Sequence, residues 1–445
     1  MKVLLISPNI TGMKDGVNRI QPPLGICYLA SVAREAGHEV FVRDTALEDY
    51  SNQVEIGRGL VNIGESDEKI KEFIQKINPD VIGVTATLSS LESSALNTIK
   101  LAKEVNPDIV TVLGGNHITF SEKDFAVDYV IKGEGEVAFV KLLDNLKNNI
   151  KPDKIITGLP FENLDELPFP ARDLMNIEKY FKINLFHSSR SGRRILNVMT
   201  SRGCPQECSF CTTPKMWGNR FRFRSAENVI EEIKGYVEKY NIEEVQFEDD
   251  TLTLNIQNLY KLCDLLKPMN LKWCVPNGIR INYHVDQHEE MFRRMKESGC
   301  FQVTLACESG NQRVLDEVLN KNLKLEQIKP AIEKAKKVGL QVHTFWLVGA
   351  PGETRKEMEE TIEFASKCGA DSYTVSIYCP LPGSKLFDKV MKEGLWLDGG
   401  FSNLMIYRKS FIRVDGFETG KEFEDWVTEQ NAFLNKGSKF FVKQT

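Results

Sequence analysis

The 445-residue chain has no large surplus of charge of either sign: 57 Lys and Arg stand against 62 Asp and Glu, a formal net charge of −5. It has no long basic run either, and these two absences disfavour nucleic acid as the main partner. No uninterrupted apolar stretch approaches the roughly 20 residues that a membrane-spanning helix needs. We therefore expect a globular protein without a membrane span, built from two or three domains at this length.

The N-terminal stretch "MKVLLISPNI" lacks the features of an export signal. It has one Lys and a short apolar run that ends at Pro8, which is typical of a first β-strand. The expected location is therefore the reducing cytoplasm, where the ten cysteines would not form a disulfide framework.

Strand and helix patterns alternate through the first third of the chain. Apolar runs predict strands over 2–7, 38–44, 81–87 and 109–115, with a short strand from 128, and helical spacing lies between them. This order predicts an α/β domain over residues 1–145, with a Rossmann-like (flavodoxin-like) parallel sheet. Ligands of such sheets bind beyond the carboxyl ends of the strands. Small residues there let a large flat ligand approach the backbone, and the candidates are Thr85, Thr87, Leu88, Gly114, Gly115, His117, Gly133 and Gly135.

A second βα series follows a proline-containing segment. Residues 146–190 contain four prolines and no clean period, which predicts a linker. Six further βα units then predict a partial (β/α)6 barrel over 191–394, and residues 395–445 are expected to form a short C-terminal cap.

Three cysteines are crowded into "GCPQECSFC", directly after the first strand of the predicted barrel. The spacing Cys204-x3-Cys208-x2-Cys211 suits soft metal ligation by an iron–sulfur cluster or by zinc. A structural zinc site would want a fourth Cys or His nearby, and the next sixty residues offer only Cys263. Three ligands would leave one coordination position open for chemistry. The seven other cysteines form no second motif, and packing is the favoured interpretation for them.

This motif, with Phe210 before its last cysteine, resembles the signature of the radical S-adenosylmethionine (SAM) superfamily. In that family three cysteines bind a [4Fe–4S] cluster, and SAM chelates the fourth iron. The stretches "QPPLGICYLASVAREAGHEV", "DVIGVTATLSS", "VLGGNHIT" and "IKGEGE" resemble the cobalamin-binding domain found ahead of some radical SAM enzymes. The resemblance therefore implies three cofactors: the [4Fe–4S] cluster, SAM and cobalamin.

The resemblance also implies roles for residues at the ends of the barrel strands. Contacts to SAM are expected from Phe210, Glu248, Asp249, Asp250, Glu308, Ser309, Gly349 and Pro351. One of the three acidic residues after the second barrel strand could instead cap the following helix. For Arg280 a contact to the SAM carboxylate and a surface salt bridge both stay open.

In the cobalamin-binding family the nucleotide tail threads between the sheet and a helix, past the Thr/Ser loop and the Gly-Gly pair. Members that ligate cobalt from below carry Asp-x-His-x-x-Gly after the first strand. This chain has "SPNITGMKDG" there, so no histidine from this loop is expected on cobalt. His38 is expected to be structural. His117 has two interpretations, a ligand contact or a hydrogen-bonded loop histidine, and the second is favoured.

The resemblance implies an enzyme that forms a 5′-deoxyadenosyl radical and transfers a methyl group from methylcobalamin to an unactivated carbon. Its expected partners are a small-molecule, lipid or natural-product substrate and an electron donor such as flavodoxin or ferredoxin. One alternative is a ring-forming or C–C-coupling radical SAM enzyme that uses cobalamin differently or not at all. Another is a non-catalytic metal- and corrinoid-binding protein. A methylthiotransferase is disfavoured, because that family carries a second set of three cysteines where this chain has only Cys27.

Overall fold

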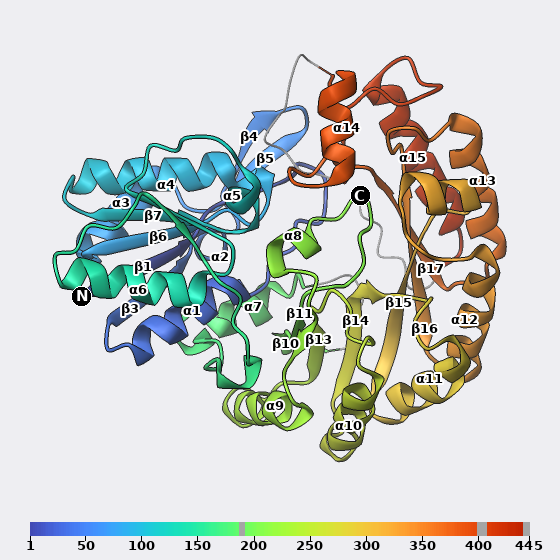
Figure 1. The fold of residues 1–445 in the computed structure, drawn as a ribbon, viewed down its shortest axis with the longest axis horizontal. Helices are drawn as coiled ribbons and strands as arrows, with labels where there is room; N and C mark the ends of the chain where they lie inside the picture. The colour runs from blue at the N-terminus through green and yellow to red at the C-terminus, as the bar shows by residue number, and fades with distance from the viewer. Residues whose placement is uncertain (187–191, 398–406, 439–445) are drawn as a thin grey trace. The chain divides into compact units, whose positions relative to one another are not determined.

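The computed structural model describes residues 1–186, 192–397 and 407–438. The chain divides into two compact units, one ending at Phe186 and the other formed by the described residues from 192 onward (Figure 1). Each unit is built around a six-stranded parallel sheet, so the predicted α/β class is confirmed. No helix within these ranges is long and apolar enough to cross a membrane.

The first unit has a parallel sheet in the order β3-β1-β6-β7-β8-β9. Its central strands are covered on both faces, which explains why they are nearly continuous apolar runs; Val3, Leu4 and Leu5 of β1 are completely buried. The strands are β1 (Lys2–Ser7), β3 (Glu39–Asp44), β6 (Val81–Thr85), β7 (Val110–Gly114), β8 (Tyr129–Lys132) and β9 (Ile155–Thr157).

Helices cover both faces of this sheet (Figure 1). On one face α1 and α6 pack over Val3 and Leu5, and on the other α3 and α4 pack over Leu4 and Ile6. The two faces alternate along β1 because successive side chains of a strand point to opposite sides. The helices are α1 (Leu24–Glu35), α2 (Thr45–Glu48), α3 (Asp67–Ile77), α4 (Glu92–Val105), α5 (Asn116–Phe120), α6 (Gly135–Lys147) and α7 (Ile177–Ile183).

A small antiparallel sheet adds a feature that the sequence analysis did not predict. Its strands are β2 (Ile10–Met13), β5 (Leu60–Ile63) and β4 (Gln53–Gly57), in that order. The segment after β1, which contains no histidine, therefore forms an edge strand paired to β5.

The expected linker is, through residue 186, part of the first unit. Strand β9 extends the sheet by pairing with β8, and Tyr180 of α7 is completely buried, with its hydroxyl donating to the Asp44 carboxylate at the end of β3. The serine hydroxyl of Ser31 on α1 donates to the carbonyl of Phe169 at 2.6 Å. These contacts give the proline-containing segment a fixed course over the sheet.

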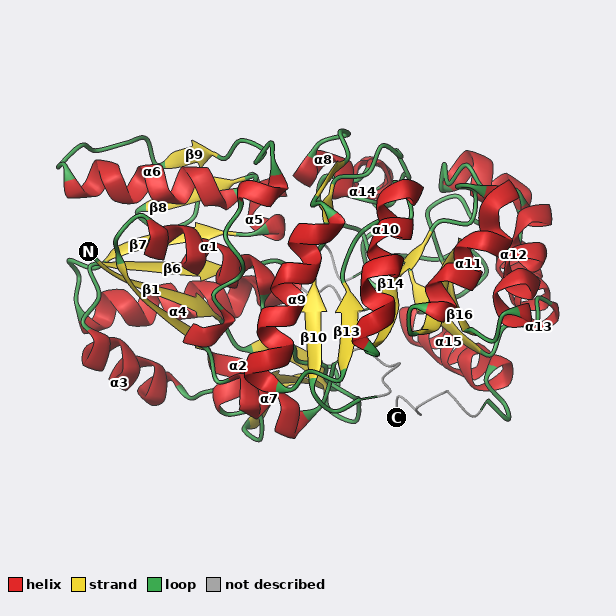
Figure 2. Ribbon diagram, turned by 90° about the horizontal axis from the view of Figure 1, so that it is seen from below, coloured by secondary structure: helices red, strands yellow, loops and turns green. Residues whose placement is uncertain are grey.

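The second unit has a parallel sheet in the order β10-β13-β14-β15-β16-β17, as expected of a partial barrel; β10 and β13 lie side by side in Figure 2. The strands are β10 (Ile195–Val198), β13 (Glu244–Phe247), β14 (Lys272–Ile279), β15 (Cys300–Glu308), β16 (Gln341–Val348) and β17 (Ser372–Ile377). The helices of this unit are α8 (Thr213–Trp217), α9 (Ala226–Tyr240), α10 (Ile256–Leu266), α11 (His288–Glu297), α12 (Leu325–Lys337), α13 (Arg355–Lys367), α14 (Lys385–Glu393) and α15 (Gly420–Leu434). A two-stranded ladder of β11 (Ser201–Arg202) and β12 (Arg222–Phe223) and a π-helix over Val314–Val318 complete the unit.

Helix α15, from the expected C-terminal cap, covers the outer edge of this sheet. Asn435 donates to the carbonyl of Tyr373 and accepts from its amide, both at 2.9 Å. Asn431 does the same with Val375 at 2.8 and 2.9 Å. Two side-chain amides thus satisfy backbone groups of β17 that a bare edge strand would expose. Residues 398–406 and 439–445 of the expected cap lie outside the described residues.

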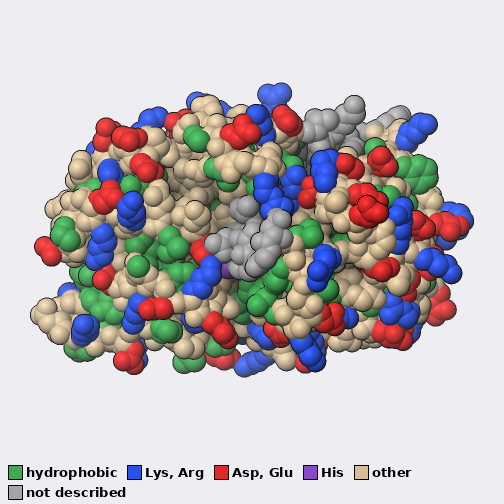
Figure 3. Space-filling model, turned by 90° about the horizontal axis from the view of Figure 1, so that it is seen from above, with side chains coloured by type: hydrophobic (Ala, Val, Ile, Leu, Met, Phe, Trp, Pro, Cys, Tyr) green, Lys and Arg blue, Asp and Glu red, His purple; other side chains and the backbone are tan. Residues whose placement is uncertain are grey.

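Charged side chains of both signs are scattered over the face of the molecule shown in Figure 3. This mixed pattern agrees with the near balance of acidic and basic residues in the sequence.

Candidate active site

The three motif cysteines lie on one short loop between β11 and α8. Cys204 and Cys208 are 8% and 7% exposed, and Cys211 is half-buried. The amide of Cys211 donates to the carbonyl of Cys208 at 3.0 Å, so a tight turn joins the last two cysteines of the motif. Gly203 has φ +92°, and a Cβ there would lie 2.4 Å from the carbonyl of Arg220. The glycine before Cys204 is therefore a requirement of the loop conformation.

Neighbouring segments hold this loop from two sides. The amide of Ser209 donates to the carbonyl of Leu319 at 2.8 Å, and the amide of Leu386 donates to the carbonyl of Ser209 at 2.9 Å. Asn320 donates from its side chain to the carbonyl of Glu207 at 2.9 Å. The loop is thus fixed by the turn that follows the π-helix and by the first turn of α14.

Burial keeps two of the motif thiols protonated in the free protein. It raises the pKa of Cys204 and raises the pKa of Cys211 to about 11. Iron would therefore displace protons on binding, as it does at any thiolate site. Within the described residues no group of three His, Cys, Asp or Glu side chains converges as around a single ion. The donor set, three thiols on one held loop, fits a multi-iron cluster with cysteine ligands.

The acidic residues after β13 have different surroundings. Asp249 is completely buried; its carboxylate accepts from the Thr200 amide at 3.1 Å, the Thr200 hydroxyl at 2.8 Å and the hydroxyl of Ser201. Burial raises its pKa to about 6. Asp249 thus binds the segment that leads into the cysteine loop.

As residues, Glu248 is half-buried and Asp250 is exposed, whereas Asp249 is completely buried. The side-chain amide of Asn277 donates to the Glu248 carboxylate at 3.1 Å. Asp250 is exposed and accepts from the Thr213 hydroxyl at 3.2 Å, and the Thr213 amide lies 3.4 Å from the sulfur of Cys211. Both acids therefore lie at the carboxyl end of the sheet, and Asp250 is linked through one residue to the cysteine loop.

Glu308 ends β15 in a left-handed conformation with φ +65°. Its carboxylate pairs with the ammonium group of Lys321 at 2.7 Å, and that ammonium lies 5.7 Å from the ring centre of Phe210 in the cysteine motif. Ser309 is completely buried, and its hydroxyl lies 3.0 Å from the hydroxyl of Thr361 on α13. Glu308 and Phe210 are therefore brought together, whereas the Ser309 hydroxyl is used to attach β15 to α13.

A buried glutamate shapes the turn after β16. Glu353 accepts from the amide of Gly349 at 2.8 Å and from that of Ala350 at 3.1 Å, and burial raises its pKa to about 8. Gly349 has φ +81°, and the carbonyl of Pro351 accepts from the Lys389 ammonium at 3.1 Å. The predicted SAM contacts Gly349 and Pro351 thus lie on a turn whose backbone Glu353 fixes.

In the first unit, the candidate cobalamin residues gather at the carboxyl edge of the sheet. Thr85 and Gly114 are partners in the β6–β7 ladder, and Thr87 and Leu88 follow with exposed side chains. Gly115 has φ +110°, and a Cβ there would lie 2.7 Å from the carbonyl of Ala86 and 2.8 Å from the Thr85 hydroxyl. The glycine thus lets the loops after β6 and β7 meet.

The two glycines after β8 also serve close packing. Gly133 has φ +85°, and a Cβ there would lie 2.8 Å from the carbonyl of Gly158, just after β9. Gly135 begins α6 with Leu29 of α1 only 3.1 Å from its Cβ position. The chain just after β9, a strand that was expected to be linker, is therefore part of the reason for the glycine at 133.

His117 is held by an acid from α4. Its Nε2 lies 2.5 Å from the carboxylate of Glu92, and both side chains are nearly inaccessible. The other carboxylate oxygen of Glu92 accepts from Lys123 at 2.6 Å. Of the two interpretations of His117, the structure therefore agrees with the hydrogen-bonded loop histidine. His38 lies after α1, at the amino end of β3, away from this edge.

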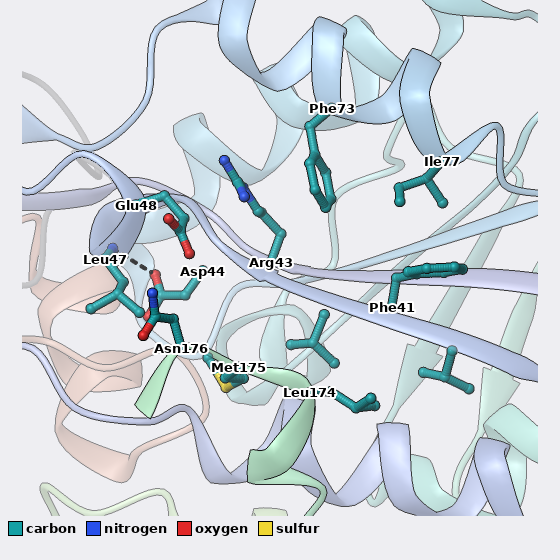
Figure 4. Close-up of a pocket in the computed structure, with 12 residues that line it drawn as sticks. Phe41, Arg43, Asp44, Leu47, Glu48, Phe73, Ile77, Leu174, Met175 and Asn176 are labelled. Carbon is teal, nitrogen blue, oxygen red and sulfur yellow. Dashed lines mark hydrogen bonds between the residues drawn. The ribbon is translucent and has the colours of Figure 1, made fainter. Parts of the chain in front are cut away.

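A cavity of about 370 Å³ follows the outer strand β3, bounded by Phe73 and Ile77 of α3 and by the segment Leu174–Asn176 (Figure 4). None of the predicted cobalamin residues lines it. Its charged groups are already bound within the unit: Arg43 pairs with Glu65, and Glu48 pairs with Lys179 at 3.1 Å. The cavity therefore does not replace the carboxyl edge as the candidate site.

Two residues near the cysteine loop were missed or left undecided by the sequence. Lys321 was not singled out, since an isolated lysine gives no signal. Arg280 is buried and donates to the sulfur of Cys208 at 3.2 Å, so its surface salt bridge is not observed. The contact spans 72 residues of sequence and could not be inferred from spacing.

Comparison with known proteins identifies both units. The radical SAM superfamily model matches residues 198–365, and the B12 binding domain model matches residues 12–143. The solved structure of the radical SAM methyltransferase TsrM from Kitasatospora setae, with cobalamin and a [4Fe–4S] cluster bound, superposes with a TM-score of 0.68. It is 16% identical and covers 88% of this chain and 78% of its own, so it supports the fold of both units.

Sequence relatives extend over nearly the whole chain. The cytidylyl-2-hydroxyethylphosphonate methyltransferase of Streptomyces wedmorensis is 31% identical over 482 aligned positions, covering 98% of this chain and 90% of that protein. The uncharacterized methyltransferase PH0819 of Pyrococcus horikoshii is 34% identical, with 89% and 84% covered. The anaerobic magnesium-protoporphyrin IX monomethyl ester cyclase of Rubrivivax gelatinosus is 28% identical, with 88% and 70% covered. This chain belongs to the cobalamin-dependent radical SAM enzymes, which join a B12 binding domain to a radical SAM domain and use a [4Fe–4S] cluster, SAM and cobalamin.

Proposed function

We propose that the protein transfers a methyl group to an unactivated carbon of a small-molecule substrate. The observation that carries this proposal is a three-cysteine loop and a B12 binding domain on one chain whose relatives over most of its length include methyltransferases. When bound, the cluster with SAM supplies hydrogen abstraction from carbon, and cobalamin supplies the methyl group.

Cys204, Cys208 and Cys211 are the proposed ligands of the cluster. Their loop is already held by backbone hydrogen bonds to Leu319 and Leu386, so little ordering is left for cluster binding. Three protein ligands leave the fourth iron to SAM, which needs acceptors for its amine and hydroxyl groups.

Among the predicted SAM contacts, the side chains fall into two groups. Glu248, Asp250, Glu308 and Phe210 have groups directed to the carboxyl end of the sheet or to the cysteine loop, and Gly349 and Pro351 offer backbone groups on the turn after β16. Asp249 and Ser309 are bound to protein hydroxyls, so we assign them to holding the strand ends that carry the contacts. Their effect on SAM would be through position.

Cobalamin is proposed to bind at the carboxyl edge of the first sheet, beside Thr85, Thr87, Leu88, Gly114, Gly115, His117, Gly133 and Gly135. Small residues there let backbones approach each other and leave exposed edges for a large ligand. His117 is bonded to Glu92 and would keep this partner, so it is not proposed as a cobalt ligand. The segment after β1 forms strand β2 and contains no histidine.

The remaining partners follow from the chemistry. An external one-electron donor such as flavodoxin or ferredoxin is required to reduce the cluster, and a cytoplasmic location would provide it. The substrate is proposed to be a small molecule, with a lipid or another natural product as the wider class.

Ring formation without methyl transfer is the second candidate, and one observation favours it: the cyclase of Rubrivivax gelatinosus covers 88% of this chain. A third candidate, a non-catalytic corrinoid-binding protein, predicts bound SAM without cleavage. Products of SAM distinguish them: methyl transfer and ring formation both release 5′-deoxyadenosine, but only methyl transfer also yields S-adenosylhomocysteine.

The experiment is anaerobic reconstitution, reduction by a one-electron donor such as flavodoxin, and assay of 5′-deoxyadenosine and S-adenosylhomocysteine. We expect about four irons per chain, the content of one [4Fe–4S] cluster, and both products from the native protein. The variant Cys204→Ala/Cys208→Ala/Cys211→Ala should lose iron and 5′-deoxyadenosine together. Cys263→Ala, a buried cysteine of α10, is the matched control and should retain both. A triple variant that still cleaves SAM would refute the assignment of the cluster.

A further inference from the structure

The guanidinium group of Arg280 is enclosed behind the cysteine loop. It follows β14 and is 6% exposed. Nη1 donates to the sulfur of Cys208 at 3.2 Å, Nε donates to the side-chain oxygen of Asn282 at 3.2 Å, and Nη2 donates to the backbone carbonyl of Lys321. The Tyr283 ring lies on another side, 5.6 Å away. Each of the three guanidinium nitrogen atoms therefore donates a hydrogen bond to an acceptor of the protein.

Among the described residues, no carboxylate forms an ion pair with Arg280. Its acceptors are a sulfur, an amide oxygen and a carbonyl oxygen, none of which carries a charge while Cys208 is a thiol. A buried cation without an anion costs several kcal/mol, so proteins rarely keep one unless its counter-charge arrives with a ligand. The thiolate that Cys208 becomes on binding iron would be that anion.

The same guanidinium links two parts of the candidate site. Through Cys208 it touches the cysteine loop, and through the carbonyl of Lys321 it holds the residue whose ammonium group pairs with Glu308 at 2.7 Å. Arginine suits this position because its donors form a rigid planar fork, whereas lysine offers one flexible point charge.

We propose that Arg280 is a positioning residue that donates a charged hydrogen bond to the Cys208 ligand of the cluster and raises the reduction potential of that cluster. This inference rests on the proposed ligation by Cys208. Reduction adds one negative charge to the cluster, and a fixed positive donor at a ligand sulfur favours the reduced form. Hydrogen bonds to sulfur and buried charge are among the factors that set iron–sulfur potentials.

The test is a redox titration of the reconstituted whole chain, followed by the EPR signal of the reduced cluster and accompanied by an iron count. Arg280→Gln removes the charge but keeps an amide donor. We expect it to bind four irons and to show an approximately tenfold lower ratio of reduced to oxidised cluster at a fixed potential, which corresponds to about 59 mV for a one-electron couple. Arg313→Gln is the control, because Arg313 is an exposed arginine of the same unit, paired with Glu357 at 2.5 Å. Its potential should equal that of the native protein.

An Arg280→Gln variant with four irons and an unchanged potential would overturn the proposal. If Arg280→Gln binds fewer irons, Arg280→Lys, which keeps the positive charge but not the planar fork, is titrated instead: a potential lowered by less than about 59 mV supports the proposal, and one lowered by about 59 mV or more contradicts the role of the charge. Cys208→Ala separates this inference from the proposed function. Native iron content in Cys208→Ala would refute the ligation itself, whereas loss of iron there leaves the Arg280 titrations as the test of this inference alone.

Discussion

The ammonium group of Lys321 lies 2.7 Å from the carboxylate of Glu308, and the two side chains are only 6% and 13% exposed. Glu308 ends β15 in a left-handed conformation, and Lys321, 13 residues after Glu308, follows the π-helix. The pair therefore closes the connection after β15 back onto the strand end. It also places a carboxylate and a cation beside Phe210 of the cysteine loop.

Removing Lys321 should destabilise the second unit. Lys321→Met would leave the Glu308 carboxylate buried without its partner, which costs about 3 kcal/mol in comparable pairs. Lys324→Met is the control: its pair with Asp316 at 3.2 Å is largely exposed and should contribute less than about 1 kcal/mol. Urea unfolding of the whole chain measures both changes in the free energy of unfolding. Equal effects of the two substitutions would show that the Glu308 pair is not buried as described.

Asp44 and Tyr180 give the first unit a pH-dependent stability. Burial raises the pKa of Asp44 to about 6 from an ordinary value of 3.8. The native state therefore holds this proton more tightly than the unfolded chain, so its contribution to stability is complete below pH 4 and is lost as the pH rises to 6. The loss amounts to about 3 kcal/mol, at 1.36 kcal/mol for each pKa unit.

Asp44→Asn should remove that contribution while still accepting the hydrogen bonds from Ala46 and Leu47 that begin α2. The quantity to measure is the difference in the free energy of unfolding between the native chain and this variant, from pH 4 to 7. It should fall with rising pH and be level above pH 6. Tyr180→Phe removes a hydrogen-bond donor that lowers the pKa of Asp44. In this variant the loss of stability with rising pH should therefore extend to higher pH. A difference that is constant over this range would contradict the assignment.

Gly114 and Gly115 are adjacent but should respond differently to alanine. Gly115→Ala strains a left-handed backbone and places a methyl group 2.7 Å from the carbonyl of Ala86, so we expect a loss of about 2 kcal/mol of stability. Gly114→Ala meets its nearest atom, the carbonyl of Ile131, at 3.4 Å and should fold normally. Because its methyl group would enter the space proposed for the cobalamin tail, we expect several-fold weaker binding, measured by visible absorbance. Native affinity in Gly114→Ala would remove Gly114 from the site.

The succession of most core strands along the chain could be predicted from the sequence, and so could the loop that carries the three cysteines. Apolar runs separated by helical spacing are a strong sequence signal of a parallel sheet. They predicted where β6, β7 and β8 end, and with these ends the positions of Thr85, Gly114 and Gly133. The cysteine loop after β10 was located by spacing alone. The strand ends and the cysteine loop are both visible in local sequence patterns. Because parallel strands bring their carboxyl ends to one edge of a sheet, these patterns also indicate which residues lie near one another.

The segment after α6 could not be predicted in the same way. Strand β9 has three residues, too few to show a period, and α7 is short and follows several prolines. Their place in the first unit depends on Tyr180 reaching Asp44, 136 residues earlier. Long-range polar contacts of this kind have no signature in a single sequence.

The same limit applies to side chains at the site. Asp249, Ser309 and Glu308 each lie at or directly after a strand end, so the sequence made all three candidate SAM contacts, with Glu308 favoured. Their roles separate only when Thr200, Thr361 and Lys321 are brought next to them by the fold.

The EPR spectrum of the cobalt(II) form of the reconstituted protein tests the central claim most directly. That claim is that a B12 binding domain without a histidine on cobalt works with the radical SAM domain of the same chain. We predict one bound cobalamin per chain and a cobalt(II) signal without superhyperfine splitting from an axial nitrogen, because the segment after β1 contains no histidine and His117 is bonded to Glu92. Failure of the whole chain to bind cobalamin, or nitrogen splitting that disappears in His117→Ala, would contradict the account.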